Sequence, residues 1–201
     1  MVSRPNKGAR PGKRPGQSNQ IRIIGGEHGG RKLRFPDHVG LRPTSDRVRE
    51  TLFNWLMSIL PGADCLDLFA ASGAIGFEAA SRGAGSVTML DTAPVVVRQL
   101  RENCGLLGLE NVVIQQANAS TWLDGPSEPF EIVFLDPPFA DDLLEGCCEK
   151  LEANGWLAPE ARIYIEMDAH KKLPPPLPAN WQQLKEKKAG QVAFFLYLRG
   201  N

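Results

Sequence analysis

Residues 65–76 read Cys-Leu-Asp-Leu-Phe-Ala-Ala-Ser-Gly-Ala-Ile-Gly: an apolar strand, a turn of small residues and the start of a helix. From there the chain alternates between two patterns, with strands predicted at 65–69, 86–91, 111–116, 132–135 and 162–167 and helices at 74–82, 95–107 and 143–153. Two last strands, at 181–188 and 191–198, are expected to form an antiparallel hairpin. This order predicts an α/β fold, a doubly wound, seven-stranded and mostly parallel sheet.

Polar or small residues follow three successive predicted strands. Sheets of this kind bind ligands beyond the carboxyl ends of their strands, at the point where the strand order reverses. Ala70, Ser72 and Gly73 let the backbone approach a ligand, and the helix that follows favours an anionic group at its N-terminus. Asp91 ends the second strand and can bind both hydroxyls of a ribose. Asn118, near the end of the third, can hydrogen-bond an adenine edge, so an adenosine-containing ligand is predicted.

The glycine pattern decides between adenosine-containing cofactors. A nicotinamide cofactor needs G-x-G-x-x-G to approach its pyrophosphate, but Ala71 replaces the first glycine and only Gly73-x-x-Gly76 remains. No Walker lysine motif follows, which disfavours a nucleoside triphosphate. S-adenosylmethionine has no phosphate and a single carboxylate, so it fits this turn better.

The stretch Leu135-Asp136-Pro137-Pro138-Phe139 follows a buried strand. The two prolines lack an N–H and cannot continue the strand, which leaves Asp136 facing a cleft and Phe139 as a flat apolar surface. A carboxylate beside a ring suits an aromatic base with an exocyclic amine, because the carboxylate accepts its hydrogens and the ring stacks on it. Taken alone, the motif is equally compatible with an ordinary exit from a strand.

Charge is distributed unevenly along the chain. Residues 1–50 hold 12 Lys and Arg against 4 Asp and Glu, whereas the remainder holds 11 against 19. Residues 1–20 form a Pro/Gly-rich basic arm that we expect to be disordered, and residues 21–36 a β-hairpin with Arg22, Arg31, Lys32 and Arg34. A basic arm on an acidic body indicates an anionic polymer as partner, and a solubilising tail is the alternative.

Composition bounds the remaining possibilities. We expect one domain at 21–201, including the hairpin, which is long enough to be stable without metal or disulfide. The four cysteines form no C-x-x-C pair and lie far from the histidines in sequence, so no metal site is predicted. The absence of a long apolar run and the cysteine usage favour a cytoplasmic protein without a membrane span.

Three segments together carry a resemblance to a known family. Residues 42–50 (Arg-Pro-Thr-Ser-Asp-Arg-Val-Arg-Glu), residues 67–73 and residues 136–139 resemble the bacterial 16S ribosomal RNA guanine-N2 methyltransferases. The similarity covers about residues 21–199, including Gly190-Gln191-Val192-Ala193. It implies an S-adenosylmethionine-dependent enzyme that methylates the N2 amine of one guanine, on 16S rRNA or on the small ribosomal subunit, and we expect a monomer.

The residue pattern and the resemblance together give expected roles to individual residues. Those expected at the reaction are Asp136, Pro137 and Phe139. Those expected to hold the cofactor are Asp67, Phe69, Ala70, Ser72, Gly73, Asp91, Asn118 and Thr44. Those expected to bind RNA are Arg22, Arg31, Lys32, Arg34, Arg42 and Arg47. Two alternatives stay open: a purely structural role for Asp67 in bonding local backbone, and a purely structural role for residues 42–49 as a capped helix start with a charged face.

Two features depart from the family pattern: Ala71 stands where the family usually has glycine, and the basic arm is longer than the family needs. Two other functions remain compatible with the sequence. One is methylation of adenine N6 in DNA, which the Asp-Pro-Pro-Phe turn permits. The other is a non-catalytic RNA-binding protein of ribosome assembly on the same fold.

Overall fold

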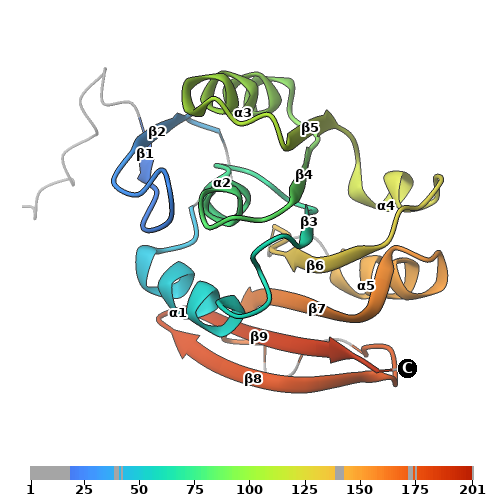
Figure 1. Ribbon diagram of the computed structural model, residues 1–201. Helices are drawn as coiled ribbons and strands as arrows, with labels where there is room; N and C mark the ends of the chain where they lie inside the picture. Colours follow the sequence, from blue (N-terminus) through green and yellow to red (C-terminus); the bar gives the residue numbers. More distant parts are fainter. Residues whose placement is uncertain are drawn as a thin grey trace, which may run out of the picture.

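The computed structural model describes residues 19–38, 41, 43–138, 143–171, 174 and 176–200 (Figure 1). The strands are β1 (Asn19–Arg22), β2 (Lys32–Phe35), β3 (Asp64–Asp67), β4 (Ser86–Asp91), β5 (Val112–Gln116), β6 (Phe130–Leu135), β7 (Leu157–Asp168), β8 (Trp181–Ala189) and β9 (Val192–Arg199). The helices are α1 (Asp46–Leu56), α2 (Ala74–Ser81), α3 (Pro94–Leu107), α4 (Ala119–Trp122) and α5 (Leu144–Ala153). None of the described helices is long and apolar enough to cross a membrane.

The main sheet has seven strands in the order β5-β4-β3-β6-β7-β9-β8, which confirms the predicted architecture. Strands β5, β4, β3, β6 and β7 are parallel, and β9 pairs antiparallel with both β7 and β8. The chain order reverses between β3 and β6. A ligand site in such a sheet lies beyond the carboxyl ends of these two strands.

Several elements differ from the prediction, and β3 ends at Asp67 rather than at residue 69. β1 begins at Asn19, two residues inside the predicted arm, and residues 1–18 lie outside the described part of the chain. β7 begins at Leu157 rather than at residue 162, because Pro159 is a residue that argues against a strand interior. In the structure, Glu160 next to it has a positive φ of 56°. The single turn α4 was missed, since four residues are too few to show a helical period.

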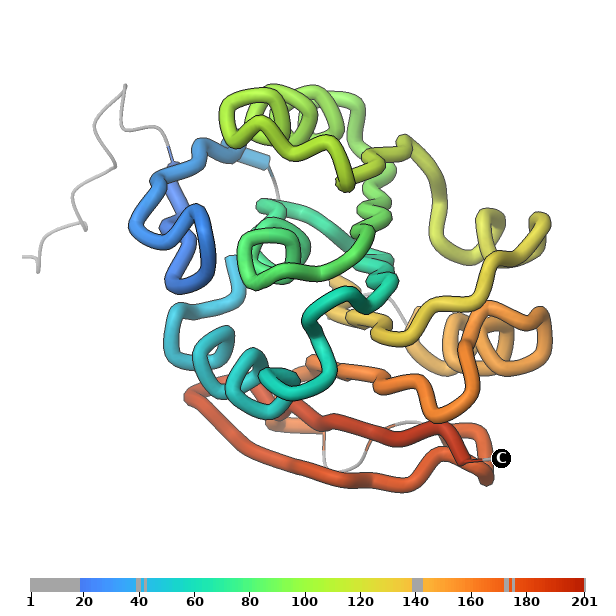
Figure 2. The backbone as a smooth tube through the Cα atoms, viewed as in Figure 1, coloured from blue at the N-terminus to red at the C-terminus, as the bar shows by residue number. Residues whose placement is uncertain are grey.

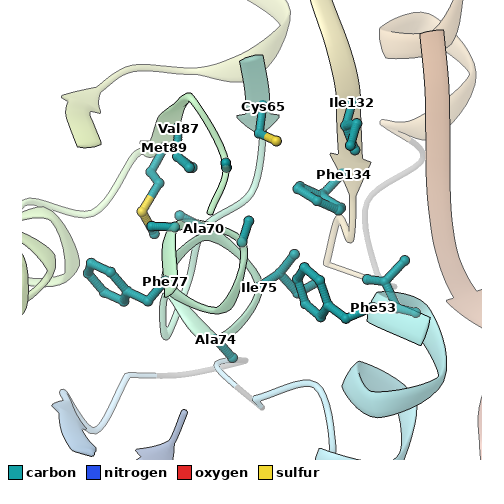
Figure 3. Packing of buried hydrophobic residues seen from close by; sticks show 14 of the residues in the cluster. Phe53, Cys65, Ala70, Ala74, Ile75, Phe77, Val87, Met89, Ile132 and Phe134 are labelled. Carbon is teal, nitrogen blue, oxygen red and sulfur yellow. The ribbon is translucent and has the colours of Figure 1, made fainter. Parts of the chain in front are cut away.

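An apolar cluster covers each face of the sheet. On one face α1, α2 and the hairpin pack over the sheet, and Figure 3 shows Phe134 of β6 beside Phe53 of α1 and Ile75 of α2. The Phe53 and Phe134 ring centroids are 6.2 Å apart. On the other face α5 and α4 cover Val133 and Leu135. Alternate residues of β6 therefore point to different sides, and Asp136 follows Phe134 onto the α1 side.

The carboxylate of Glu78 anchors the hairpin to the body. This fully buried side chain accepts from the backbone N–H of Ile24 (2.8 Å) and Gly25 (2.9 Å) and pairs with Arg49 (3.0 Å) and Arg82 (2.7 Å). Next to it, a Cβ on Gly26 would lie 1.8 Å from the carbonyl oxygen of Ser81. The hairpin consequently sits close against α2 and α3 (Figure 2).

Candidate active site

A small cavity lies at the carboxyl ends of β3 and β6. Its lining residues are Thr44, Asp67, Phe69, Ala70, Ala71, Ser72, Ala74, Ile75 and Asp136. The fold thus brings together the turn of small residues after β3, Asp136 after β6, and Thr44 in the segment before α1. These were three separate predictions from sequence, and they meet in one place.

Backbone hydrogen bonds hold the turn after β3 in shape. The N–H of Ala70 donates to the carbonyl of Leu90 (2.8 Å), and the N–H of Ala71 donates to Asp91 Oδ2 (3.1 Å). Asp91 Oδ1 also accepts from the N–H of Ala93 (2.8 Å). Gly73 is the N-cap of α2 with φ 78°, and a Cβ there would lie 2.5 Å from the Phe77 ring. Asp91 is therefore fixed beside the turn, while Gly73, the N-cap residue of α2, itself supplies no side-chain hydrogen bond.

Asp67 is buried at the base of this cavity. Its Oδ2 accepts a hydrogen bond from the backbone N–H of Gly76 (3.0 Å), so the local backbone contact considered from sequence is present. Burial, with a further contribution from the charge of Asp136, raises the pKa of Asp67 to about 7. It still lines the cavity and can face a ligand there.

Asp136 is oriented by a partner from a distant part of the chain. The hydroxyl of Thr44 donates to Asp136 Oδ2 over 3.1 Å. Burial raises the pKa of Asp136 to about 6, and the Thr44 hydrogen bond acts in the opposite direction. Thr44 was expected to bind cofactor; the structure also gives it direct contact with the candidate catalytic acid.

A second acid, Glu166, lies next to Asp136 and was missed by sequence reasoning. Leu135 of β6 pairs with Ile165 of β7, so the following residues, Asp136 and Glu166, are neighbours across the sheet. Tyr164 donates to Glu166 Oε2 (2.9 Å). Burial and the charge of Asp136 raise the pKa of Glu166 to about 8, against the effect of Tyr164. The available signal was a glutamate directly after the apolar run of residues 163–165.

The remaining predicted site residues fall into three groups. Phe69 and Ser72 line the cavity, and Pro137 is buried directly after Asp136. Asn118 is exposed, and its Oδ1 accepts from the N–H of Thr121 (3.2 Å) as the N-cap of α4. The structure thus gives this side chain a structural role, and its contact with adenine stays a prediction. Phe139 and Arg42 lie outside the described residues.

All described residues that were predicted to bind RNA are exposed. They are Arg22, Arg31, Lys32 and Arg34 on the hairpin and Arg47 in the first turn of α1. Arg31 reaches across to the carbonyl of Leu106 on α3 (3.0 Å), and Arg22 lies 3.8 Å from Asp46. The hairpin therefore presents Arg31 near α3 and Arg22 near the start of α1.

The charges around the cavity decide which cofactor fits. Asp67 and Asp136 line it, Asp91 supports its turn, and none of its lining residues is cationic. Carboxylates repel a pyrophosphate but favour a ligand with a positive amine and sulfonium. With the topology and the Asp-Pro-Pro turn, this site defines an S-adenosylmethionine-dependent methyltransferase.

Comparison with known proteins identifies the family. Residues 21–198 match the model of the family described as conserved hypothetical protein 95, and the chain belongs to that family. It is 52% identical over 182 residues to ribosomal RNA small subunit methyltransferase D of Escherichia coli (strain K12), covering 90% of this chain and 91% of that protein. It is 45% identical over 188 residues to the Haemophilus influenzae protein of the same name, covering 91% and 96%.

Solved structures agree with this assignment. The putative methyltransferase yhhF from Escherichia coli superposes with a TM-score of 0.85 at 49% identity, covering 90% of this chain and 99% of that one. A putative methylase from Haemophilus influenzae gives a TM-score of 0.78 at 41% identity, covering 91% and 100%.

Proposed function

We propose that this protein transfers the methyl group of S-adenosylmethionine to the exocyclic N2 amine of a guanine in 16S rRNA. The observation that carries the proposal is Asp136, held by Thr44 at a strand end that shares one cavity with the turn after β3. The relatives named as ribosomal RNA small subunit methyltransferases support the choice of substrate.

Residues on three strand ends would hold the cofactor, whose methyl group is the electrophile when it is bound. We assign the methionine amino group to Asp67, the ribose hydroxyls to Asp91 and the adenine edge to Asn118. Phe69 and the backbone of Ala70, Ser72 and Gly73 would enclose the methionine part. Thr44 would border it beside Asp136.

Asp136 would activate the acceptor amine. Guanine N2 is a poor nucleophile, because its lone pair is delocalised into the ring. With a pKa of about 6, Asp136 is mostly ionised at pH 7 and can accept the amine hydrogens together with the carbonyl of Pro137. Its charge stabilises the positive charge that develops on the nitrogen, and Phe139 would stack on the flipped base.

The RNA would contact the exposed cations. We assign phosphate contacts to Arg22, Arg31, Lys32, Arg34, Arg42 and Arg47, with the basic arm of residues 1–20 as an additional contact. The expected partner is 16S rRNA or a small-subunit particle, the expected place of action the cytoplasm, and the expected active form a monomer.

The deciding experiment offers labelled S-adenosylmethionine with unmodified small-subunit particles, naked 16S RNA or DNA, and digests each product to nucleosides. N2-methylguanosine in either RNA sample supports the proposal, and the better of the two defines the substrate state. N6-methyladenine in the DNA sample would instead identify the protein as a DNA adenine-N6 methyltransferase. Asp136→Asn is the inactive control. If wild type binds the cofactor but, like this control, makes no product in any sample, the result would contradict this choice of substrates.

A further inference from the structure

Strand β8 forms one edge of the sheet and is exposed from residue 182 to residue 188. Because β8 and β7 are each antiparallel to β9, β8 runs in the same direction as β7 and β6. The carboxyl end of β8 therefore lies at the same end of the strands as Asp136, which follows the carboxyl end of β6. In Figure 1 this end, at the β8–β9 turn, and the blue hairpin both lie on the left of the view.

The register places two of its lysines on the same side of the sheet as Asp136. Lys185 pairs with Leu196 and Lys187 with Phe194, and both partners belong to the apolar cluster under α1. Cross-strand partners point to the same side, so Lys185 and Lys187 lie on the α1 side. We call them the α1-side lysine pair. The intervening Glu186 pairs with Phe195 of the opposite cluster and lies on the other side.

The register also sets how far the pair lies from the candidate active site. Glu166, beside Asp136, pairs with Phe194, which pairs with Lys187. Three strand spacings therefore separate Lys187 from Asp136, roughly 14 Å between backbones. On the hairpin, Arg31 reaches α3, which packs on β4 and β5 toward the opposite edge of the sheet, while Arg22 lies beside Asp46 of α1. The candidate active site is thus flanked by cations on both sides, in a body whose residues 51–201 hold 19 acids against 11 Lys and Arg.

We propose that Lys185 and Lys187 bind phosphates of the RNA that carries the target guanine, on the side of the active site opposite the hairpin. This rests on the proposed function in that RNA is the substrate. Lysines on edge strands also prevent pairing between sheets, but that protection does not depend on which side of the sheet they occupy. Binding of RNA phosphates near Asp136, by contrast, requires lysines on the α1 side of the sheet.

Lys188 provides the matched control, because it neighbours Lys187, is equally exposed and pairs with Ala193 on the opposite side. The measurement is the salt dependence of affinity for 16S RNA with the full chain, for Lys187→Gln, Lys185→Gln/Lys187→Gln and Lys188→Gln. Each phosphate contact adds about 0.7 to the slope of log affinity against log salt on single-stranded RNA. We expect a slope lower by about 0.7 for Lys187→Gln and about 1.4 for the double variant, with no change for Lys188→Gln.

Activity assays separate this proposal from the proposed function. With wild type methylating RNA, the double variant should show a KM for RNA raised about tenfold and an unchanged kcat, since cofactor and Asp136 are untouched. Equal slopes for all variants, or equal losses for Lys187→Gln and Lys188→Gln, would overturn it. The proposal would also be overturned if the double variant self-associated while its salt-dependence slope stayed at the wild-type value, since the lysines would then only protect the edge strand. If wild type makes no N2-methylguanosine, the proposed function fails, while the binding slopes still test the lysine pair.

Discussion

The hydroxyl of Thr44 donates a hydrogen bond to Oδ2 of Asp136 over 3.1 Å, although 92 positions separate the two residues in the chain. Thr44 immediately precedes Ser45, the N-cap of α1, whose Oγ accepts from the N–H of Val48 (3.4 Å). The start of this helix therefore determines where the candidate catalytic carboxylate points. It also stabilises the ionised form of Asp136, against the effect of burial.

Removal of the Thr44 hydroxyl should shift the pH dependence of methylation. In Thr44→Val the pKa of Asp136 should rise further above about 6, because the Thr44 hydrogen bond that stabilises its ionised form is lost. Activity should fall severalfold between pH 6 and 7 and recover toward pH 8. A profile of kcat against pH measures this. Thr44→Ser is the control and should keep the wild-type acid limb; an unshifted limb in Thr44→Val would contradict the assignment.

Loss of the Asp136 carboxylate should separate chemistry from cofactor binding. Asp136→Ala should lower kcat by about 10²–10³, because the group that stabilises charge on the amine is gone. Affinity for S-adenosylmethionine, measured by calorimetry, should change less than about threefold, since three other strand-end residues are assigned to the cofactor. Asp91→Ala is the reciprocal control and should weaken cofactor binding first. Equal loss of both properties in Asp136→Ala would argue against this division.

Glu166 should make the protein less stable as pH rises. Its pKa in the folded state is about 8, above the ordinary value of 4.5, so the folded state favours the protonated form. The unfolded chain can ionise this carboxyl from pH 4.5 upward, and stability is lost progressively from there to about pH 8. Glu166→Gln cannot ionise and should escape this loss.

The difference between the two proteins should therefore grow with pH. Free energies of unfolding from urea titrations at pH 5, 6.5 and 8 should move in favour of Glu166→Gln by roughly 2–4 kcal/mol across this range. Asp67 and Asp136 also have raised pKa values, but both proteins share them. A difference independent of pH would mean that Glu166 is ionised in the folded protein.

Ala71 should be a site of backbone strain. Its φ of 46° lies in the left-handed region, which costs a residue with a Cβ about 1–2 kcal/mol. Ala71→Gly relieves this cost but loosens the unfolded chain, so a net gain of about 0.5–1 kcal/mol is expected. Chemical unfolding measures it, and Ala70→Gly, at a buried neighbour without positive φ, should instead destabilise. A loss of stability in Ala71→Gly would show that the turn is not strained.

Local patterns were sufficient for most of the fold. The strands around Cys65, Val87 and Ile132 were predictable as short apolar stretches bounded by turn residues, and the helix at 95–107 from its helical period. The predicted start of β7 was wrong, because Pro159 is a residue that disfavours a strand locally. Pro159 and Glu160 form part of a 12-residue strand, and the sheet tolerates them through the register shift between Phe130 and Ile132.

The sequence by itself indicated which acids lie at or near the ends of the central strands, and hence that Asp67, Asp91 and Asp136 would gather at the carboxyl ends of the sheet. Only the tertiary structure decided their neighbours. Thr44 meets Asp136 because α1 packs across the sheet, and Glu166 lies beside it because of the β6–β7 register. The physical reason is that an element's period depends on residues a few positions apart. Strand register and helix packing instead depend on side chains that are distant in sequence and meet only in the folded core.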